Sequence, residues 1–166
     1  MDPNSGRKYL SIAEYAERIS IDLPHIAIAM ADEIAFDSST RRKTMAKKRT
    51  LEWFHQLALD ERVDWNATSL FGVVPGFLES DKIQDFLLKL LQSGAKGVVV
   101  GGVFQGETEE QSSTAIRNIR DCLDATTSSD EKIPLMVQNV RTPSQVSIPI
   151  INILDVVNVS IMYSRR

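Results

Sequence analysis

The sequence has only one cysteine, Cys122, and only two histidines among its 166 residues. A single cysteine excludes an internal disulfide framework and a structural zinc site built from several cysteines, and it is typical of a reducing compartment. Strong charge of one sign is also missing, since 19 Lys and Arg against 22 Asp and Glu give a net charge of −3. Bulk positive charge of the kind that coats nucleic acid is therefore excluded, although a local basic patch is not.

Long apolar runs are absent as well. No stretch approaches the ~20 apolar residues that a membrane-spanning helix needs, and the first eight residues (MDPNSGRK) are polar where a secretory signal has its apolar core. The composition, 43% hydrophobic and 25% charged, is that of an ordinary globular protein. We expect one domain over residues 1–166, without an integral membrane span.

The most informative stretch is residues 97–107 (GVVVGGVFQGE). Consecutive valines followed by a Gly-Gly pair and a polar run are typical of a buried parallel strand that opens into a loop. In βα architectures ligands lie over such strand ends, where glycine permits a close approach. Taken alone, Gly101 and Gly102 are explained as well by a simple turn.

Helical and strand patterns alternate along the whole chain. Apolar residues at helical spacing predict helices over about 11–20, from the polar cluster 37–40 to 58, from a Ser80 cap to Gly94, over 109–123, and a shortened one from 142. Short apolar runs predict strands over 26–31, 69–74, 97–101, 134–138 and 156–162.

This alternation predicts an α/β fold with five parallel strands joined by right-handed crossovers. A closed (β/α)₈ barrel has eight strands and typically about 250 residues. The pattern therefore fits either an open five-stranded sheet or a section of a barrel, and periodicity does not separate the two.

Several side chains are candidates for chemistry. Asp32 and Glu33 follow the strand that begins at Ile26, where acid–base groups are often placed, although either can simply begin a loop. His25 and His55 have no second histidine nearby and are not assigned as metal ligands. Cys122 lies on the apolar face of its helix and is predicted to be a small buried residue.

Six cations fall within nine residues of the second predicted helix. They can contact phosphates or simply form a solvated face, and no aromatic residue is interleaved with them, so the signal for nucleic acid is weak. The six are Arg41, Arg42, Lys43, Lys47, Lys48 and Arg49.

Five segments in order resemble the tRNA-guanine transglycosylase family, also called the queuine tRNA-ribosyltransferases. Residues 28–33 (IAMADE) are similar to the family's MAFDE strand, and residues 49–53 (RTLEW) to its RTLRW segment. Residues 70–76 (LFGVVPG) resemble FGIVQGG, and residues 98–107 (VVVGGVFQGE) resemble GYAVGGLAVGE. Residues 132–146 (KIPLMVQNVRTPSQV) resemble KPRYLMGVGTPEDLL. One such motif is weak, but five in register are specific.

The resemblance implies a (β/α)₈ barrel with a zinc-binding insertion, and a base exchange in tRNA in which an aspartate attacks the ribose. Asp32 matches the aspartate that hydrogen-bonds the base, and Gly101 and Gly102 match the loop glycines that approach it. Pro75 replaces a base-reading glutamine and offers no side-chain hydrogen bond. Asn158 falls at the nucleophile position, and an amide lacks the anionic oxygen that covalent catalysis needs.

Further departures point to the family's non-catalytic accessory subunit. Ile34 replaces a cysteine beside the base, residues 8–15 (KYLSIAEY) resemble the subunit's KLSPEEYIEA, and residues 102–106 (GVFQG) resemble its DGFQG. The expected partners are a catalytic subunit, in a heterodimer, and tRNA through that complex. No catalytic residue is expected intact, and the base pocket of Asp32, Pro75 and the two glycines is expected to be vestigial.

The resemblance also sets expectations for cofactors and location. No cofactor is expected in this chain, since the zinc-binding tail would lie beyond Arg166, and the first barrel strands are also expected to be missing. The location implied is cytoplasmic, with peripheral association at the mitochondrial outer membrane. Two alternatives stay open: an independently active transglycosylase using Asp32 and Glu33, or a barrel fragment without function.

Overall fold

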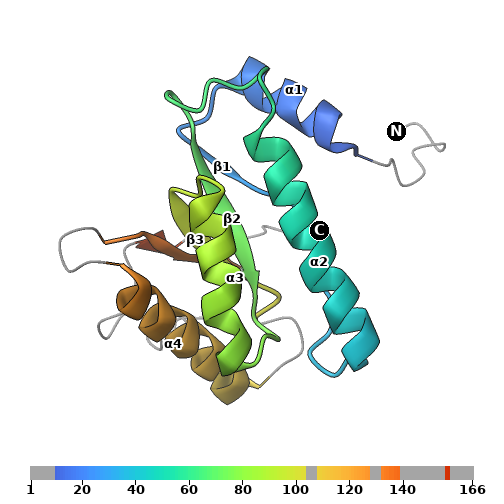
Figure 1. Cartoon of the computed structure of the whole chain (residues 1–166), viewed down its shortest axis with the longest axis vertical. Coiled ribbons are helices and arrows are strands. Elements are labelled where there is room, and N and C mark those ends of the chain that lie inside the picture. Colours follow the sequence, from blue (N-terminus) through green and yellow to red (C-terminus); the bar gives the residue numbers. More distant parts are fainter. Residues whose placement is uncertain (1–9, 104–107, 128–131, 139–155, 158–166) are drawn as a thin grey trace, which may run out of the picture.

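The computed structural model describes residues 10–103, 108–127, 132–138 and 156–157. Helices and strands alternate as expected (Figure 1). The elements are α1 (Ile12–Asp22), β1 (Ile26–Ile28), α2 (Thr40–Ala58), β2 (Ser69–Pro75), α3 (Ser80–Gln92), β3 (Gly97–Gly101), α4 (Glu109–Thr126), β4 (Leu135–Val137) and β5 (Val156–Val157).

The strands form one parallel sheet in the order β1-β2-β3-β4-β5, and the sheet is curled. Residue pairs across it include Ile28 with Phe71, Val73 with Val99, and Val99 with Met136. A strand order that follows the chain differs from that of a doubly wound open sheet, where the order reverses. The predicted α/β fold is therefore confirmed, in the arrangement of part of a (β/α) barrel.

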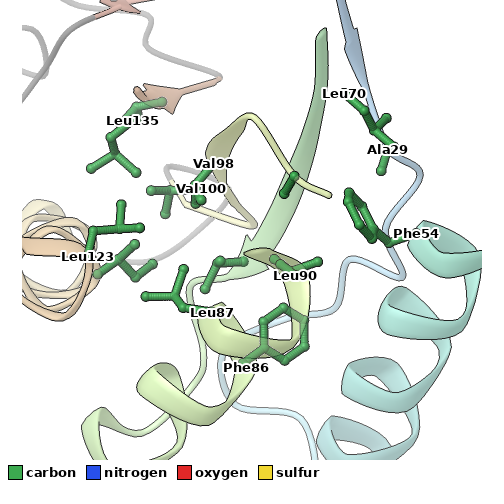
Figure 2. Close-up of a cluster of buried hydrophobic side chains, with 14 of the residues drawn as sticks. Ala29, Phe54, Leu70, Phe86, Leu87, Leu90, Val98, Val100, Leu123 and Leu135 are labelled. Atoms are coloured by element: carbon green, nitrogen blue, oxygen red, sulfur yellow. The ribbon is translucent and has the colours of Figure 1, made fainter. Parts of the chain in front are cut away.

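The helices pack on one face of the sheet and bury the main core there. In Figure 1, α3 lies over β2 and β3, with α2 on one side of it and α4 on the other. Figure 2 shows Leu87 and Leu90 of α3 among Val98 and Val100 of β3, with Phe54 of α2 beside the neighbouring strands. All five of these side chains are 0–1% exposed. This face carries most of the buried apolar area of the described chain, and its burial is the main source of stability.

The opposite face holds a smaller cluster of strand residues. Phe71, Val73, Val99 and Met136 pack together there, and the cluster contains no buried residue from a described helix. The ring of Phe71 lies so close to Gly97 of the adjacent strand that a Cβ at Gly97 would overlap it. In a (β/α) barrel this face is the barrel interior, filled by layers of side chains.

Local sequence signals account for most helix ends. Ser11 and Glu14 form the expected capping box at the start of α1, and Gly94 ends the α3 region with a φ of +96°. Thr108 forms a second capping box at the start of α4. The prediction that Ser80 caps α3 is wrong by one residue: Ser80 is the first helical residue, and Glu79 holds the capping position without a side-chain capping bond.

The strand predicted over 26–31 is shorter than expected and ends at Ile28. One reason lies in the packing of α1, whose Tyr15 hydroxyl donates a 2.7 Å hydrogen bond to the carbonyl oxygen of Ile28. The helix predicted from 142 and residues 158–162 of the last predicted strand lie outside the described residues. Within the described part, no helix is both long and apolar enough to cross a membrane.

Candidate functional site

The carboxyl ends of β1, β2 and β3 meet around a small hollow. It brings together six residues singled out in the sequence, namely Asp32, Glu33, Ile34, Pro75, Gly101 and Gly102. The full lining is Ala31, Asp32, Glu33, Ile34, Val73, Pro75, Phe77, Gly101 and Gly102. Parallel strands deliver their loops to one edge of a sheet, which is why segments far apart in the chain converge here.

Asp32 lies at this edge, and its carboxylate is held by two arginines. Arg42 donates two hydrogen bonds of 2.7 Å, one to each carboxylate oxygen, and Arg49 donates a third of 2.7 Å. The backbone N–H of Asp32 also donates to the buried hydroxyl of Thr50 at 3.0 Å. The Asp32 side chain is 10% exposed, against 41% and 42% for the two arginines.

These contacts determine the charge state of Asp32. The paired hydrogen bonds from Arg42, reinforced by the charges of Arg42 and Arg49, hold the pKa of Asp32 below its usual range despite partial burial. The carboxylate is therefore ionised at neutral pH, and three of its roughly four acceptor positions are used by the guanidinium groups. A ligand that used Asp32 as an acceptor would have to compete with a bidentate arginine.

Sequence reasoning placed Arg42 and Arg49 in a general basic run and missed this role. The two arginines are seven residues apart, which puts them on the same face of α2 two turns apart. That spacing, on a helix that follows Asp32 directly, is the signal that could have identified them as its partners. Phe77, which closes the hollow, was also missed, since nothing in its local sequence marks it.

Glu33 and Gly101 lie together on the other side of the hollow. A Cβ at Gly101 would stand 3.2 Å from a carboxylate oxygen of Glu33 and 2.5 Å from a methyl group of Val73. The space at Gly101 is thus filled by this chain's own side chains. Glu33 is exposed, although one of its carboxylate oxygens lies beside Gly101.

Pro75 and Gly102 define the end of the strands. Pro75 pairs with Gly101 at the last position of β2, and the next residue, Gly76, donates a 2.8 Å backbone hydrogen bond to the Gly101 carbonyl. Gly102 has a φ of +69°, a conformation that glycine adopts without strain, so the turn itself requires this residue. Pro75 contributes no polar side-chain atom to the hollow.

The volume of the hollow is about 10 Å³. That is about the smallest space able to admit one water molecule, roughly 10–15 Å³. A purine ring has about ten non-hydrogen atoms and is larger than this enclosed space. That the base pocket is vestigial stays a prediction.

The other predicted positions do not join this site. Asn158 lies outside the described residues, so its assignment stays a prediction. Cys122 is only half-buried on α4, a correction to its expected full burial, and desolvation there raises the pKa of its thiol. His55 lies on α2 with Nδ1 3.3 Å from the hydroxyl of Ser93. His25 precedes β1, where its carbonyl accepts a hydrogen bond from the N–H of Ser69.

No metal centre is found among the described residues. Nowhere in that part of the chain do three His, Cys, Asp or Glu side chains come together as ligands. The zinc expected of the resembling family therefore has no ligand set there, and Cys122 is the only cysteine of the sequence.

Comparisons with known proteins agree with the sequence motifs. The family model for queuine tRNA-ribosyltransferase matches residues 2–164. A queuine tRNA-ribosyltransferase of Chromobacterium violaceum is 29% identical over 128 residues, which are 74% of this chain and 33% of the relative. The chain thus spans about a third of the length of the curated relative it matches.

Proposed function

Because this chain belongs to the queuine tRNA-ribosyltransferase family, we propose that it acts as a non-catalytic accessory subunit of that enzyme. In this role it pairs with a catalytic subunit, and the heterodimer exchanges guanine for queuine at the wobble position of a tRNA anticodon. The chain itself contributes structure and tRNA contact and carries out no chemical step.

The observation that carries the proposal is the state of Asp32. The residue that matches the family's base-binding aspartate has both carboxylate oxygens bonded to Arg42, and one of them also to Arg49. Three hydrogen bonds from arginine already occupy most of the acceptor capacity of this carboxylate, so a base that bonds to it competes with charge-assisted partners. The pair favours a role in the fold over a role in base recognition.

Pro75 supports the same conclusion from the neighbouring strand. Active relatives place a glutamine at the matching position, and its amide would bond to the base edge. Pro75 removes that donor and acceptor, and the hollow beside it has a volume of about 10 Å³. A site without that polar partner loses both orientation and discrimination of the base.

Asn158 adds a chemical reason that rests on sequence alone. An amide at the nucleophile position has no anionic oxygen to attack the ribose, so a covalent ribosyl intermediate is not formed. The aspartate that performs this attack then has to come from the partner subunit.

The test is co-expression with a catalytic transglycosylase subunit, followed by affinity purification through a tag on this chain. We expect a one-to-one complex that incorporates labelled guanine or queuine into tRNA, while this chain alone does not exceed a buffer control. Monomeric behaviour in the presence of the catalytic subunit would contradict the proposal. Exchange by the isolated chain that Asp32→Ala abolishes would show instead that it is an enzyme in its own right.

A second experiment separates loss of chemistry from loss of base recognition. Asn158→Asp restores the carboxylate at nearly constant volume, and Pro75→Gln restores the amide. We expect no covalent tRNA adduct from Asn158→Asp alone, because the base is not oriented. An adduct trapped with that single change would show that the non-catalytic assignment is wrong in mechanism.

A further inference from the structure

The outer edge of the sheet lies at β1. This strand is the first in the sheet order, and among the described residues it pairs with β2 alone (Figure 1). The N–H of Ala29 donates to the Phe71 carbonyl at 2.9 Å, so the backbone groups at positions 25, 27 and 29 face β2. Because backbone groups alternate in direction along a strand, those of Ile26 and Ile28 point away from β2, toward the outside of the sheet.

The groups that face outward are complementary to a second copy of themselves. If two β1 strands met in antiparallel direction, Ile26 of one copy and Ile28 of the other would exchange two backbone hydrogen bonds. A two-fold axis between the copies would repeat this exchange, so the pairing would contain four bonds. Edge strands that present such unpaired groups associate with one another unless the protein covers them.

Tyr15 of α1 covers one of these outward groups. Its hydroxyl donates a 2.7 Å hydrogen bond to the Ile28 carbonyl, on the side from which a second strand would approach. Burial raises the pKa of Tyr15, so the hydroxyl stays protonated and able to donate at neutral pH. In the symmetric pair, the Ile28 carbonyl of each copy accepts one bond from the other copy. Tyr15 therefore occupies the acceptors of two of the four bonds.

Tertiary contacts, more than local preference, hold α1 beside this edge. Ala16 and Ile19 of α1 are 0% and 4% exposed and belong to the main core. The helix ends at Leu23, whose φ of 45° lies in the left-handed region that is unfavourable for a leucine. The position of α1 therefore depends on its buried contacts and on the Tyr15 bond, and loss of these contacts uncovers β1.

Exposed apolar side chains flank the covered edge. Ile21 at the end of α1, Leu23 in the turn and Ile26 at the start of β1 are 63%, 60% and 39% exposed. Two copies paired through β1 would bury part of this apolar surface, which favours association once the edge is uncovered. Three side chains alone are far from the ~800 Å² per partner that a stable interface buries, so the patch does not hold two copies together while Tyr15 covers the edge.

We propose that α1, through Tyr15, keeps the β1 edge from pairing with a second copy of this chain. The contact is autoinhibitory. The edge has the donors, the acceptors and the flanking apolar side chains for a symmetric antiparallel dimer, and the Tyr15 hydroxyl takes the Ile28 carbonyl that this dimer needs. The proposal concerns self-association, and it does not depend on the proposed function.

The experiment is sedimentation velocity of the full chain over a wide range of concentration. We expect the unchanged chain to remain monomeric where Tyr15→Ser, which removes both the ring and the bond, forms a dimer. Two acceptors are released per dimer, and each hydrogen bond changes an equilibrium by roughly two- to tenfold, so the dimer dissociation constant should fall by about tenfold. A folded Tyr15→Ser chain that stays monomeric at every concentration would overturn the proposal.

Ile26→Pro tests whether the copies pair through β1. The Ile26 N–H points outward and makes no bond to β2, so proline at this position costs no hydrogen bond of the sheet. Added to Tyr15→Ser, it removes two of the four bonds between the copies, and we expect the dimer to dissociate. In the Tyr15→Ser chain, the amide of Ile28 should become protected from hydrogen exchange as the concentration rises. A dimer that survives Ile26→Pro, or that leaves the Ile28 amide unprotected, uses another surface and contradicts the proposal.

Leu90→Ala is the matched control for loss of stability. Leu90 is buried in the main core on α3, so this variant weakens the fold and leaves Tyr15 in place. We expect it to stay monomeric, and association equal to that of Tyr15→Ser would show that general destabilisation drives the pairing. If Tyr15→Ser does not fold, as judged by circular dichroism, the double variant Ser11→Ala with Glu14→Ala takes its place. It removes the capping box of α1 and should promote the same Ile26-dependent dimer, and a folded double variant that stays monomeric would overturn the proposal.

Discussion

The two faces of the sheet are packed in different ways. On the outer face, α2, α3 and α4 cover the strands with long aliphatic and aromatic side chains, among them Phe54, Leu87 and Leu90. On the inner face, the described residues form a small cluster of Phe71, Val73, Val99 and Met136, with partly buried Ile28 and Ala31 packed against it. The inner face leads directly to the hollow at the strand ends, where Val73 is part of the lining.

The difference separates stability from the candidate site. Most of the buried apolar area lies on the outer face, so the free energy of unfolding should depend chiefly on residues that are far from the hollow. The inner face is shaped by close approaches, including Phe71 over Gly97 and Val73 beside Gly101. Substitutions on the inner face should therefore lower the free energy of unfolding by steric overlap more than by loss of buried apolar area.

The largest effect is expected from Leu90→Ala. Leu90 is fully buried, and its side chain fills the space left open by Gly72 of β2. Removing it leaves a cavity that rigid strand backbone cannot close, and we expect a loss of about 2–5 kcal/mol in the free energy of unfolding, measured by urea titration. Leu88→Ala on the same helix is the control, since Leu88 is 39% exposed and should change stability little.

The next effect in size is expected from Gly97→Ala on the inner face. The added methyl group would overlap the Phe71 ring, and overpacking of this kind destabilises by about 1–3 kcal/mol. The second change Phe71→Leu shortens the ring side chain, so the double variant should be more stable than the sum of the two single losses predicts. Strict additivity would show that the two residues do not touch in solution.

Asp32→Asn tests the carboxylate at the strand-end hollow. We expect a smaller loss in the free energy of unfolding, and a loss that depends on pH. The folded-state pKa of Asp32 is lowered, so its stabilisation is complete above the unfolded value of about 3.9 and disappears as pH falls through the lower folded value. The stability difference between the unchanged chain and the variant should therefore be largest at neutral pH and shrink below pH ~4. A difference that stays constant from pH 7 to pH 3 would refute the ionic pairing with Arg42 and Arg49.

The smallest effect is expected from Tyr15→Phe, which leaves both core clusters unchanged. It removes the 2.7 Å hydrogen bond to the Ile28 carbonyl at the edge of the sheet. A bond of this kind contributes about 0.5–1.5 kcal/mol. Amide hydrogen exchange should also become faster in β1 while α3 is unaffected, and a uniform increase throughout the sheet would contradict a local role.

Much of the fold could be predicted because its signals are local. The Ser11 and Glu14 capping box, the apolar stripe of α3 and the valine run of β3 each depend on a few neighbouring residues. The parallel direction of the strands then followed from alternation, whereas the choice between an open sheet and part of a barrel required the strand order seen in the structure. Glu79 in place of Ser80 at the start of α3 shows how a boundary shifts when two adjacent polar residues can each begin a helix.

The candidate site was predictable in position but not in its interactions. Asp32, Pro75, Gly101 and Gly102 could be placed at one edge because parallel strands end there. The seven-residue spacing of Arg42 and Arg49 indicates that they share a face of α2, but whether this face meets Asp32 depends on how α2 is rotated over the sheet. The small volume of the hollow depends on rotamers of Val73 and Phe77 that the sequence does not determine.

The contact between Phe71 and Gly97 also selects the alignment of two strands as they come together. If β3 moved by two residues relative to β2, Val99 or Ala95 would replace Gly97 opposite Phe71. In the first shift, the branched side chain of Val99 would overlap the Phe71 ring. In the second, Ala95 would have to join the strand, although it belongs to the end of the preceding loop. A shift by one residue would turn every side chain of β3 to the wrong face. Because Gly97 has no side chain, it alone fits opposite Phe71, and this selects the correct register of β3 against β2 among several valine-rich alternatives. Gly97 therefore helps to determine how the two strands pair during folding.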